Sequence, residues 1–317
     1  MSLLKVNSLA ALKLETLKAT TRGHIAYAIL IAASVLVCSN RLAALVMYAW
    51  NHDSSSQILL IPMISFYLTW LARRRIFAVT GFSIVPGITA ILSGGILFWI
   101  AGWESLRLPG NEALCLSALS LVVIWTGGFL LCYGPRALRA GAFPLLFLLL
   151  MVPFPDPILD WIIHLLQQGS TEIAYLIFRA LGVPVLRQGF VLSVPGVTIE
   201  IAKECSSIRS SMALLITCLL AAHLYLRTWW KALLFVLLSA PLSVIKNGVR
   251  IATLTLLSVY VNPDFLRGSL HRDGGFVFFF LALVVLWPVF VALEKSDRPS
   301  ANSSTAARTR SEVFDRG

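Results

Sequence analysis

The sequence predicts an all-α polytopic membrane protein of about eight transmembrane helices, with a small extracytoplasmic hairpin and one interfacial helix. Of its 317 residues, 58% are hydrophobic and only 13% are charged, whereas soluble domains carry about a quarter of charged residues. The mean hydropathy is +0.82, and the apolar residues gather in runs that approach the length needed to cross a bilayer. These observations favour an integral membrane protein over a soluble one.

Taken in order, the chain begins with a basic segment, residues 1–23, which we expect in the cytoplasm. A single membrane-embedded domain follows over 24–293, and the Ser/Thr/Arg-rich tail, 294–317, is expected to be cytoplasmic and disordered. Eight apolar runs are expected to cross the membrane, at about 24–38, 58–71, 84–103, 113–133, 143–154, 207–226, 232–259 and 274–293. Two points stay open here: the first run can extend to Met47, and Phe143–Phe154 is short for a full crossing.

Two segments between these runs do not have the pattern of a crossing. Leu159–Leu181 has helical periodicity but carries several charged and amide side chains, which favours a helix at the membrane interface. Gln188–Ile201 alternates apolar and polar residues around Pro195-Gly196, which predicts a β-hairpin with a Pro-Gly turn outside the hydrocarbon.

The distribution of charge predicts the orientation. With eight crossings and a cytoplasmic N-terminus, the inside segments hold 16 basic and five acidic residues, a net charge of +11, and the remainder has a net charge of zero. This asymmetry follows the positive-inside rule. Both termini are therefore expected in the cytoplasm.

A polar cluster at 199–212 precedes the sixth expected crossing. It contains Glu204, Cys205, Ser206, Ser207 and Arg209. Ionisable groups at the end of a membrane helix are costly unless they are paired or have a task, so the cluster is a candidate functional site. Later stretches with Asn247 and Arg250, and with His271, have the same character.

Helix length places these stretches at one depth. Cys205 precedes Arg227 by 22 residues, Arg250 follows Lys231 by 19, and His271 precedes Glu294 by 23. At about 1.5 Å per helical residue, these separations are roughly 33, 28 and 34 Å from the cytoplasmic ends. Because a hydrocarbon core is about 30 Å thick, all three residues are expected near the outer face.

Each of the three residues also has a plainer interpretation. Most membrane cysteines are small structural hydrophobes, but a thiol at a helix N-terminus beside cations favours the reactive thiolate. His271 can be an ordinary loop residue or a general base, and His24, His52, His164 and His223 are competitors for that role. Arg250 can bind an oxyanion or a carboxylate, or it can form an ion pair with Glu204 or Asp273.

At these residues the chain resembles the exosortase/archaeosortase family of membrane-embedded cysteine transpeptidases, most strongly over about 145–286. The resemblance rests on Met151-Val-Pro-Phe-Pro155, Leu181–Gly189, Glu204-Cys205-Ser206 with Arg209, Asn247-Gly-Val-Arg250, and His271 with Gly275-Phe276. A looser likeness covers Trp50, Leu60-Ile-Pro62 and Trp70-Leu-Ala-Arg73.

The resemblance implies that Cys205 is the nucleophile, with Arg250 and His271 completing a triad and Glu204, Ser206, Ser207, Arg209 and Asn247 in supporting or substrate-binding roles. It implies cleavage of C-terminal sorting signals (PEP-CTERM and similar) of exported proteins through a thioester, at the outer face of the cytoplasmic membrane. The acylated protein then passes to an acceptor, often alongside exopolysaccharide production. Ser207 departs from the glycine of many members, which puts substrate preference in question and leaves the triad intact.

A second class stays open, a polysaccharide exporter or flippase without covalent catalysis. Such a protein would place ionisable groups along a path near mid-membrane, for which Lys246, Glu172 and Arg179 are the candidates. The sequence shows no metal-ligand spacing and no phosphate-binding loop, so neither metal nor cofactor is expected, and nucleic acid is not an expected partner. The expected partners are exported proteins with a C-terminal signal, an acceptor nucleophile and the lipid bilayer.

Overall fold

The structure, a computed structural model, describes residues 21–78, 80–103, 110–201, 208–262 and 275–297. Most of the predicted N-terminal segment and most of the C-terminal tail therefore lie outside the described residues. The chain divides into two compact units, Met1–Asp160 and Trp161–Gly317, and each is described by itself.

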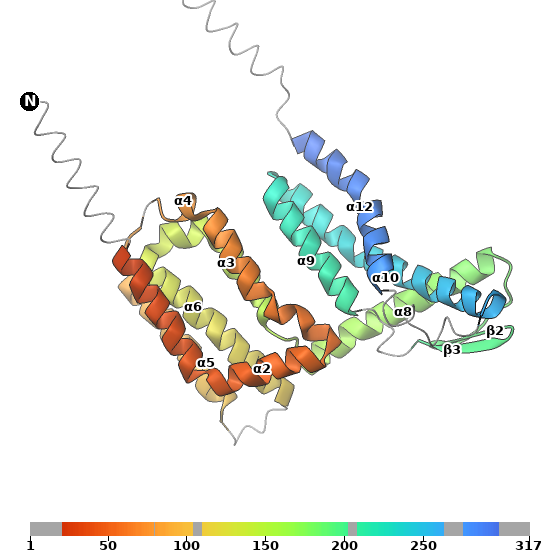
Figure 1. Cartoon of the computed structure of the whole chain (residues 1–317), viewed down its shortest axis with the longest axis horizontal. Coiled ribbons are helices and arrows are strands. Elements are labelled where there is room, and N and C mark those ends of the chain that lie inside the picture. Colours follow the sequence, from red (N-terminus) through yellow and green to blue (C-terminus); the bar gives the residue numbers. More distant parts are fainter. Residues whose placement is uncertain (1–20, 79, 104–109, 202–207, 263–274, 298–317) are drawn as a thin grey trace, which may run out of the picture. The chain divides into compact units, whose positions relative to one another are not determined.

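The N-terminal unit is a group of helices (Figure 1). Its elements are helix Thr21–Val37, α2 (Ser39–Asn51), the 3₁₀ helix η1 (Asp53–Leu59), α3 (Ile61–Leu71), α4 (Arg73–Ile76), α5 (Ile84–Ala101), α6 (Gly110–Ala140), α7 (Ala142–Phe147) and the 3₁₀ helix η3 (Leu148–Met151). The first expected crossing does not run straight on to Met47, because the chain bends by 76° between Thr21–Val37 and α2.

Helices α5 and α6 pack closely, because small residues let their backbones approach. A β-carbon at Gly87 would lie 2.6 Å from Leu131 Cβ, and one at Gly94 would lie 2.6 Å from Ile124 Cγ1. Neither position has room for a methyl group without a shift of the partner helix. The two expected crossings at 84–103 and 113–133 therefore form a tight antiparallel pair.

Helix α6 breaks where the sequence places the end of the fourth crossing. Gly134 has φ +79°, outside the helical range, and Pro135 follows it. A β-carbon at Gly134 would also meet the Gly81 carbonyl oxygen at 2.5 Å. Both the backbone angle and the close approach require glycine here.

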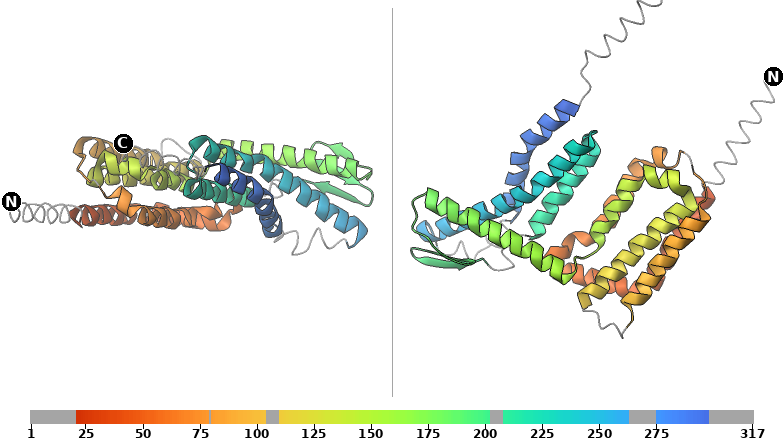
Figure 2. Two further views of the ribbon diagram at one scale, coloured as in Figure 1. Left: turned by 90° about the horizontal axis from the view of Figure 1, so that it is seen from above. Right: turned by 180° about the vertical axis from the view of Figure 1, so that it is seen from behind.

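The C-terminal unit combines long helices with a small sheet. Its elements are α8 (Asp156–Ala180, of which all but the first turn belongs to this unit), β1 (Leu186–Gln188), β2 (Val191–Val194), β3 (Val197–Glu200), α9 (Ile208–Tyr225), α10 (Trp229–Tyr260) and α12 (Gly275–Asp297). Figure 2 shows α8 and α10 crossing, with the sheet beside one end of this pair.

The predicted hairpin is present as part of a larger sheet. Strands β2 and β3 pair antiparallel with Val194 opposite Val197. Pro195 and Gly196 form the turn, and Gly196 has φ +90°, as a type II turn requires. The alternation did not predict β1, which pairs with β2 across a two-residue turn that begins at Gly189, φ +63°.

The sheet packs on the two crossing helices. Leu192, Val194 and Ile201 of the sheet region are buried with Ala174 and Phe178 of α8, and with Ile251 and Ala252 of α10. The predicted interfacial helix thus presents one stripe to the sheet. Its exposed apolar residues include Trp161 and Leu176 on other faces.

Helices α9, α10 and α12 form a bundle. An apolar cluster joins Leu214 and Cys218 of α9, Phe235 of α10, and Ala282 and Leu286 of α12. At one end of the bundle, Asp297 of α12 accepts hydrogen bonds from four donors that surround the start of α10. These donors are the Arg227 and Thr228 backbone N–H groups, Thr228 Oγ1, and Lys231 Nζ at 3.2 Å.

The prediction of an all-α polytopic membrane protein is confirmed. In the described ranges, five helices are long and apolar enough to span a bilayer, and each of two bent pairs can form one more. The pairs are Thr21–Val37 with α2, and Ala142–Met151 with α8, bent by 89°. Eight crossings would also need the short apolar helix α3 (Ile61–Leu71). The count of eight stays a prediction.

Candidate active site

The structure describes three of the eight predicted site residues, all in the C-terminal unit. These are Arg209, Asn247 and Arg250. Glu204, Cys205, Ser206, Ser207 and His271 lie outside the described residues. The site geometry is therefore that of Arg209, Asn247 and Arg250 and of the described residues that flank these segments in the sequence.

A polar turn of α10 carries Arg250. Lys246 and Asn247 are buried, with 5% and 0% of their surface exposed, and Arg250 is half-buried. Asn247 Nδ2 donates a hydrogen bond of 3.0 Å to Ser170 Oγ on α8. Buried polar groups in an apolar helix are stable only when they are bonded in this way.

Glycine makes the crossing of α8 and α10 close enough for that bond. A β-carbon at Gly248 of α10 would lie 2.5 Å from Ile173 Cβ, and one at Gly169 of α8 would lie 2.6 Å from Val244 Cγ1. Ile173 of α8 thus packs on Gly248 of α10, and Val244 of α10 packs on Gly169 of α8. This interlocking fixes the position of Asn247, and of Arg250 one turn later.

Described residues on both sides of 202–207 are held by these same helices. On one side, Gln167 Nε2 of α8 donates to the Ile201 carbonyl oxygen at 2.8 Å, and Ile201 N–H donates to the Phe190 carbonyl oxygen at 3.0 Å. On the other side, Lys246 Nζ of α10 donates to Ser210 Oγ in the first turn of α9. Both flanks of the segment that carries Cys205 therefore contact the polar crossing.

Helix α12 follows His271, the remaining member of the predicted triad, in the sequence, and its contacts with α10 show which end of the bundle it starts from. Its last residue, Asp297, bonds to Lys231 at the start of α10, and its first residue, Gly275, comes four positions after His271. Arg250 comes 19 residues after Lys231 in α10, which is an axial distance of about 28 Å. The full length of α12 is similar. The start of α12 thus belongs to the same end of the bundle as Arg250.

The described part of the site is positively charged. Lys246 and Arg250 are one turn apart on α10, and Arg209 is exposed in the first turn of α9. Like charges at this spacing repel each other, and an anion nearby relieves that repulsion. The arrangement can therefore stabilise a thiolate, a carboxylate or a developing oxyanion.

Sequence reasoning missed the contribution of α8. In the sequence, Gln167 is one of the amide side chains that favour an interfacial helix, but in the structure it is buried with Ser170 and Thr171. The available signal was their spacing, because Gln167, Ser170, Thr171, Ala174 and Phe178 recur three or four positions apart and form one stripe. That stripe faces the sheet and α10.

The groups considered for a transport path have local partners in the structure. Glu172 of α8 forms an ion pair with Arg187 of β1, and the Arg179 guanidinium lies 5.9 Å from the centre of the Tyr175 ring. Lys246 bonds to Ser210. Glu172, Arg179 and Lys246 thus each contact a different local partner, and these contacts do not favour a continuous transport path of ionisable groups.

Comparison with known protein families gives a match over most of the chain. The model of the transmembrane exosortase family matches residues 49–288, three quarters of the chain. The chain belongs to the transmembrane exosortase family. The matched range contains Cys205, Arg250 and His271, and its family is the one that the sequence motifs resemble.

The match also covers both structural units of this exosortase, from α2 to the middle of α12. The searches of curated proteins and of solved structures give no match. The fold and the site geometry therefore rest on the chain itself.

Proposed function

We propose that this exosortase is a cysteine transpeptidase or endopeptidase that cleaves the C-terminal sorting signals, PEP-CTERM-like, of exported proteins. Cys205 is the nucleophile and forms a thioester, and Arg250 and His271 complete the triad. The reaction takes place at the outer face of the cytoplasmic membrane. The acceptor of the acyl group is a nucleophile of the cell surface or water.

One observation carries the proposal: α8, and α10 one turn before Arg250, contact the described flanks of the segment with Cys205. Ile201 is bonded to Gln167 of α8, and Ser210 to Lys246 of α10, one turn before Arg250. Helices α8 and α10, which are distant in the sequence, thus hold both described flanks of this segment, and these contacts support the proposal.

The chemistry follows from the residue types. The Cys205 thiolate attacks the scissile carbonyl carbon, and the Arg250 guanidinium stabilises the negative charge that develops on the carbonyl oxygen. His271 donates a proton to the leaving amine, the carbon–nitrogen bond breaks, and the exported protein stays on Cys205 as a thioester.

The second half returns the enzyme to its starting state. The acceptor nucleophile, or water, loses a proton to His271 and attacks the thioester carbonyl carbon. The carbon–sulfur bond then breaks and the Cys205 thiolate is restored. Arg209 and the neighbouring residues Glu204, Ser206 and Ser207 orient the substrate or the thiol, and Asn247 positions Arg250 through its bond to Ser170.

The orientation is part of the proposal and rests on charge. Both termini are cytoplasmic and the site faces the exterior, because the expected inside segments have a net charge of +11 and the rest have a net charge of zero. A topology reporter fused after Arg227 is expected to report the cytoplasm. An exterior signal there would reverse the placement of the site.

The decisive experiment compares two cysteines. Cys205→Ala is expected to abolish processing of a co-expressed protein with a C-terminal sorting signal. The matched control is Cys218→Ala, because Cys218 is buried in the apolar α9–α10–α12 cluster. Cys205→Ser is expected to be inactive as well, since an alcohol is a far weaker acid than a thiol of pKa about 8.5.

Histidine provides an independent comparison. Loss of one proton-transfer group costs roughly 10²–10⁴-fold in rate, so His271→Ala is expected to retain a trace of turnover while His164→Ala behaves as wild type. Membrane abundance is measured for every variant. Normal processing by Cys205→Ala at normal abundance would end the cysteine-enzyme proposal.

A further inference from the structure

The N-terminal unit contains a large cavity that the proposed chemistry does not use. It lies between helix Thr21–Val37, α3, α4 and α6, and its volume is about 670 Å³. Ligand sites typically occupy about 300–1,000 Å³. The cavity is therefore large enough for a small or chain-like molecule.

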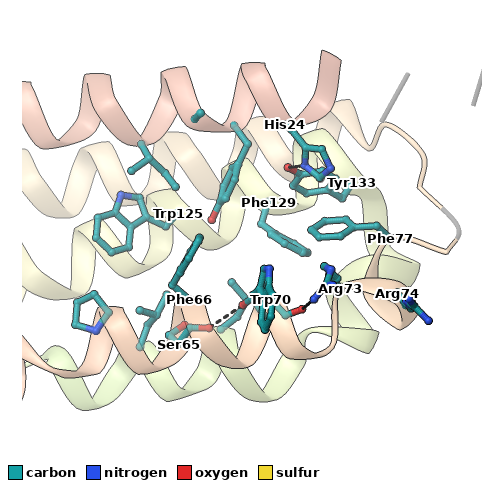
Figure 3. A pocket seen from close by; sticks show the side chains of 17 residues that line it. His24, Ser65, Phe66, Trp70, Arg73, Arg74, Phe77, Trp125, Phe129 and Tyr133 are labelled. Atoms are coloured by element: carbon teal, nitrogen blue, oxygen red, sulfur yellow. Dashed lines mark hydrogen bonds between the residues drawn. The ribbon is translucent and has the colours of Figure 1, made fainter. Parts of the chain in front are cut away.

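The walls of the cavity are aromatic and apolar. Phe66 and Trp70 of α3 face Trp125 and Phe129 of α6, and Ile31 adds an aliphatic surface (Figure 3). Trp125 Nε1 donates to Ser34 Oγ at 2.9 Å, so its polar atom is satisfied by the protein. A lining of this kind favours the binding of a hydrocarbon chain.

One end of the cavity is polar and basic. Figure 3 shows His24, Arg73, Phe77 and Tyr133 at this end, with Trp125 and Ser65 at the other. His24 Nδ1 and Tyr133 Oη are 2.7 Å apart. No acidic side chain is among the described residues that line the cavity, so this end attracts anions.

Arg73 is the cation best placed to meet a ligand. Its Nη1 donates to the Trp70 carbonyl oxygen at 2.9 Å, and its guanidinium lies 4.2 Å from the centre of the Trp70 ring. These contacts hold the group at the end of the cavity, and a guanidinium has five donors in a fork that suits phosphate. Arg74 also borders the cavity but points away from it in Figure 3.

The basic end is the cytoplasmic end by the charge distribution. Arg73 begins the run Arg73-Arg74-Arg75, and His24 opens the first helix after the basic N-terminal segment. Along α3 and the start of α4 the cavity extends from Pro62 to Arg73, about 16 Å at the rise of a helix. Its long direction thus runs from the cytoplasmic surface into the hydrocarbon.

Charge separates two kinds of occupant. A transmembrane tail of a substrate with a basic cytoplasmic end would bring that end against Arg73, an arrangement that like charge disfavours. An anionic headgroup at the same place is attracted instead.

We propose that this cavity binds an anionic phospholipid of the cytoplasmic leaflet, with an acyl chain between α3 and α6 and its phosphate on Arg73. Basic pockets between transmembrane helices on the cytoplasmic side suit anionic headgroups. The lipid fills the space between helix Thr21–Val37 and α3, and so supports the N-terminal unit. The proposal does not depend on the chemistry of Cys205.

The test uses the full chain in detergent, titrated separately with phosphatidylglycerol and phosphatidylcholine, with bound lipid counted by native mass spectrometry. Wild type is expected to bind one phosphatidylglycerol tightly and phosphatidylcholine at least about tenfold more weakly. Arg73→Gln is expected to lower the affinity for phosphatidylglycerol about tenfold, the value of one hydrogen bond to a charged group.

Matched variants separate the cavity from its surroundings. Arg75→Gln removes the same charge from the same cytoplasmic run, but Arg75 does not line the cavity, so affinity is expected to stay within twofold. Ala28→Trp fills the cavity and is expected to abolish binding. Ala33→Trp adds the same side chain at an exposed position of the same helix and is expected to bind as wild type.

Three results would overturn the proposal. These are equal binding of the two lipids, equal losses in Arg73→Gln and Arg75→Gln, or wild-type binding by a folded Ala28→Trp. Equal losses would indicate diffuse attraction to a basic surface. Cys205→Ala is expected to bind phosphatidylglycerol normally, so failure of the lipid proposal and failure of the cysteine proposal give different results.

Discussion

The cavity of the N-terminal unit and the α8–α10 crossing of the C-terminal unit differ in how closely their helices pack. At the crossing, glycines let two helices interlock, and the polar groups between them bond to each other, as Asn247 does to Ser170. In the cavity, aromatic walls stand apart and leave about 670 Å³. The crossing leaves no room for a methyl group, whereas the cavity leaves room for a ligand.

This difference shows where each unit uses its polar residues. In the C-terminal unit they are buried among protein atoms and hold Arg250 in place. In the N-terminal unit, Arg73 and His24 gather at one end of an apolar space. Rigid positioning suits covalent chemistry, which needs fixed geometry, and an apolar space with one charged end suits an amphiphile.

The largest expected effect concerns Arg250. Arg250→Lys keeps the positive charge but loses the planar fork, so cleavage is expected to fall by about 10²–10³-fold, the usual cost of an oxyanion contact. Arg179→Lys, at an exposed position near the end of α8, is expected to have wild-type activity. Full activity in Arg250→Lys would reduce that residue to a simple charge partner.

The next effect contrasts added volume in the two regions. Gly248→Ala places a methyl group 2.5 Å from Ile173 and is expected to destabilise the fold by about 1–3 kcal/mol. Ala28→Trp adds far more volume to the cavity, yet a loss below about 1 kcal/mol is expected. Heat unfolding of the purified protein in detergent measures both.

A control position makes that contrast specific. Gly95 of α5 has nothing within 4 Å of a β-carbon, so Gly95→Ala is expected to leave stability unchanged or slightly higher. If Gly248→Ala melted at the wild-type temperature, the crossing would be looser than its contacts indicate. The proposed fixed position of Arg250 would then lose its support.

The smallest effect tests the sheet beside the crossing. We propose that the hairpin Gln188–Ile201 and α8 cap the site and bind the substrate motif, because the sheet packs on Ile251 and Ala252, which follow Arg250 in α10. Gly196→Val strains a turn at φ +90° by about 1–3 kcal/mol. Cleavage is expected to fall several-fold while membrane abundance changes little.

Thr198→Val, at an exposed position of β3, keeps the turn and is expected to cleave normally. An equal fall in cleavage and abundance for Gly196→Val would give the hairpin a purely structural role.

The sequence predicts well the helices and helix ends that depend on hydropathy and on Gly or Pro residues. It predicts poorly the bends and short strands that depend on packing geometry. The end of a crossing at Tyr133 is visible as Gly134-Pro135, and the structure breaks there. The 76° bend between Thr21–Val37 and α2 has no such signal, because neither proline nor glycine lies near Cys38. Strand β1 is only three residues long, too short for alternation to show.

The site divides in the same way. Helix lengths predict that Cys205, Arg250 and His271 share one depth, and the structure describes Arg250 of these three. Their shared depth stays a prediction. The contacts of Gln167 with Ile201 and of Lys246 with Ser210 join positions 34 and 36 residues apart. Nothing local in the sequence specifies such pairs, since they depend on how the helices cross.

The hydrogen bonds to Asp297 have a consequence at the opposite end of α12. They fix the axial register of this helix against the start of α10, through Thr228 and Lys231. A slip of one residue would move the far end of α12 by about 1.5 Å. A displacement of about 1 Å at a catalytic group can cost a hundredfold in rate. Since His271 precedes that end in the sequence by four residues, its proposed role makes the Asp297 carboxylate, at the opposite end of the bundle, a determinant of the rate.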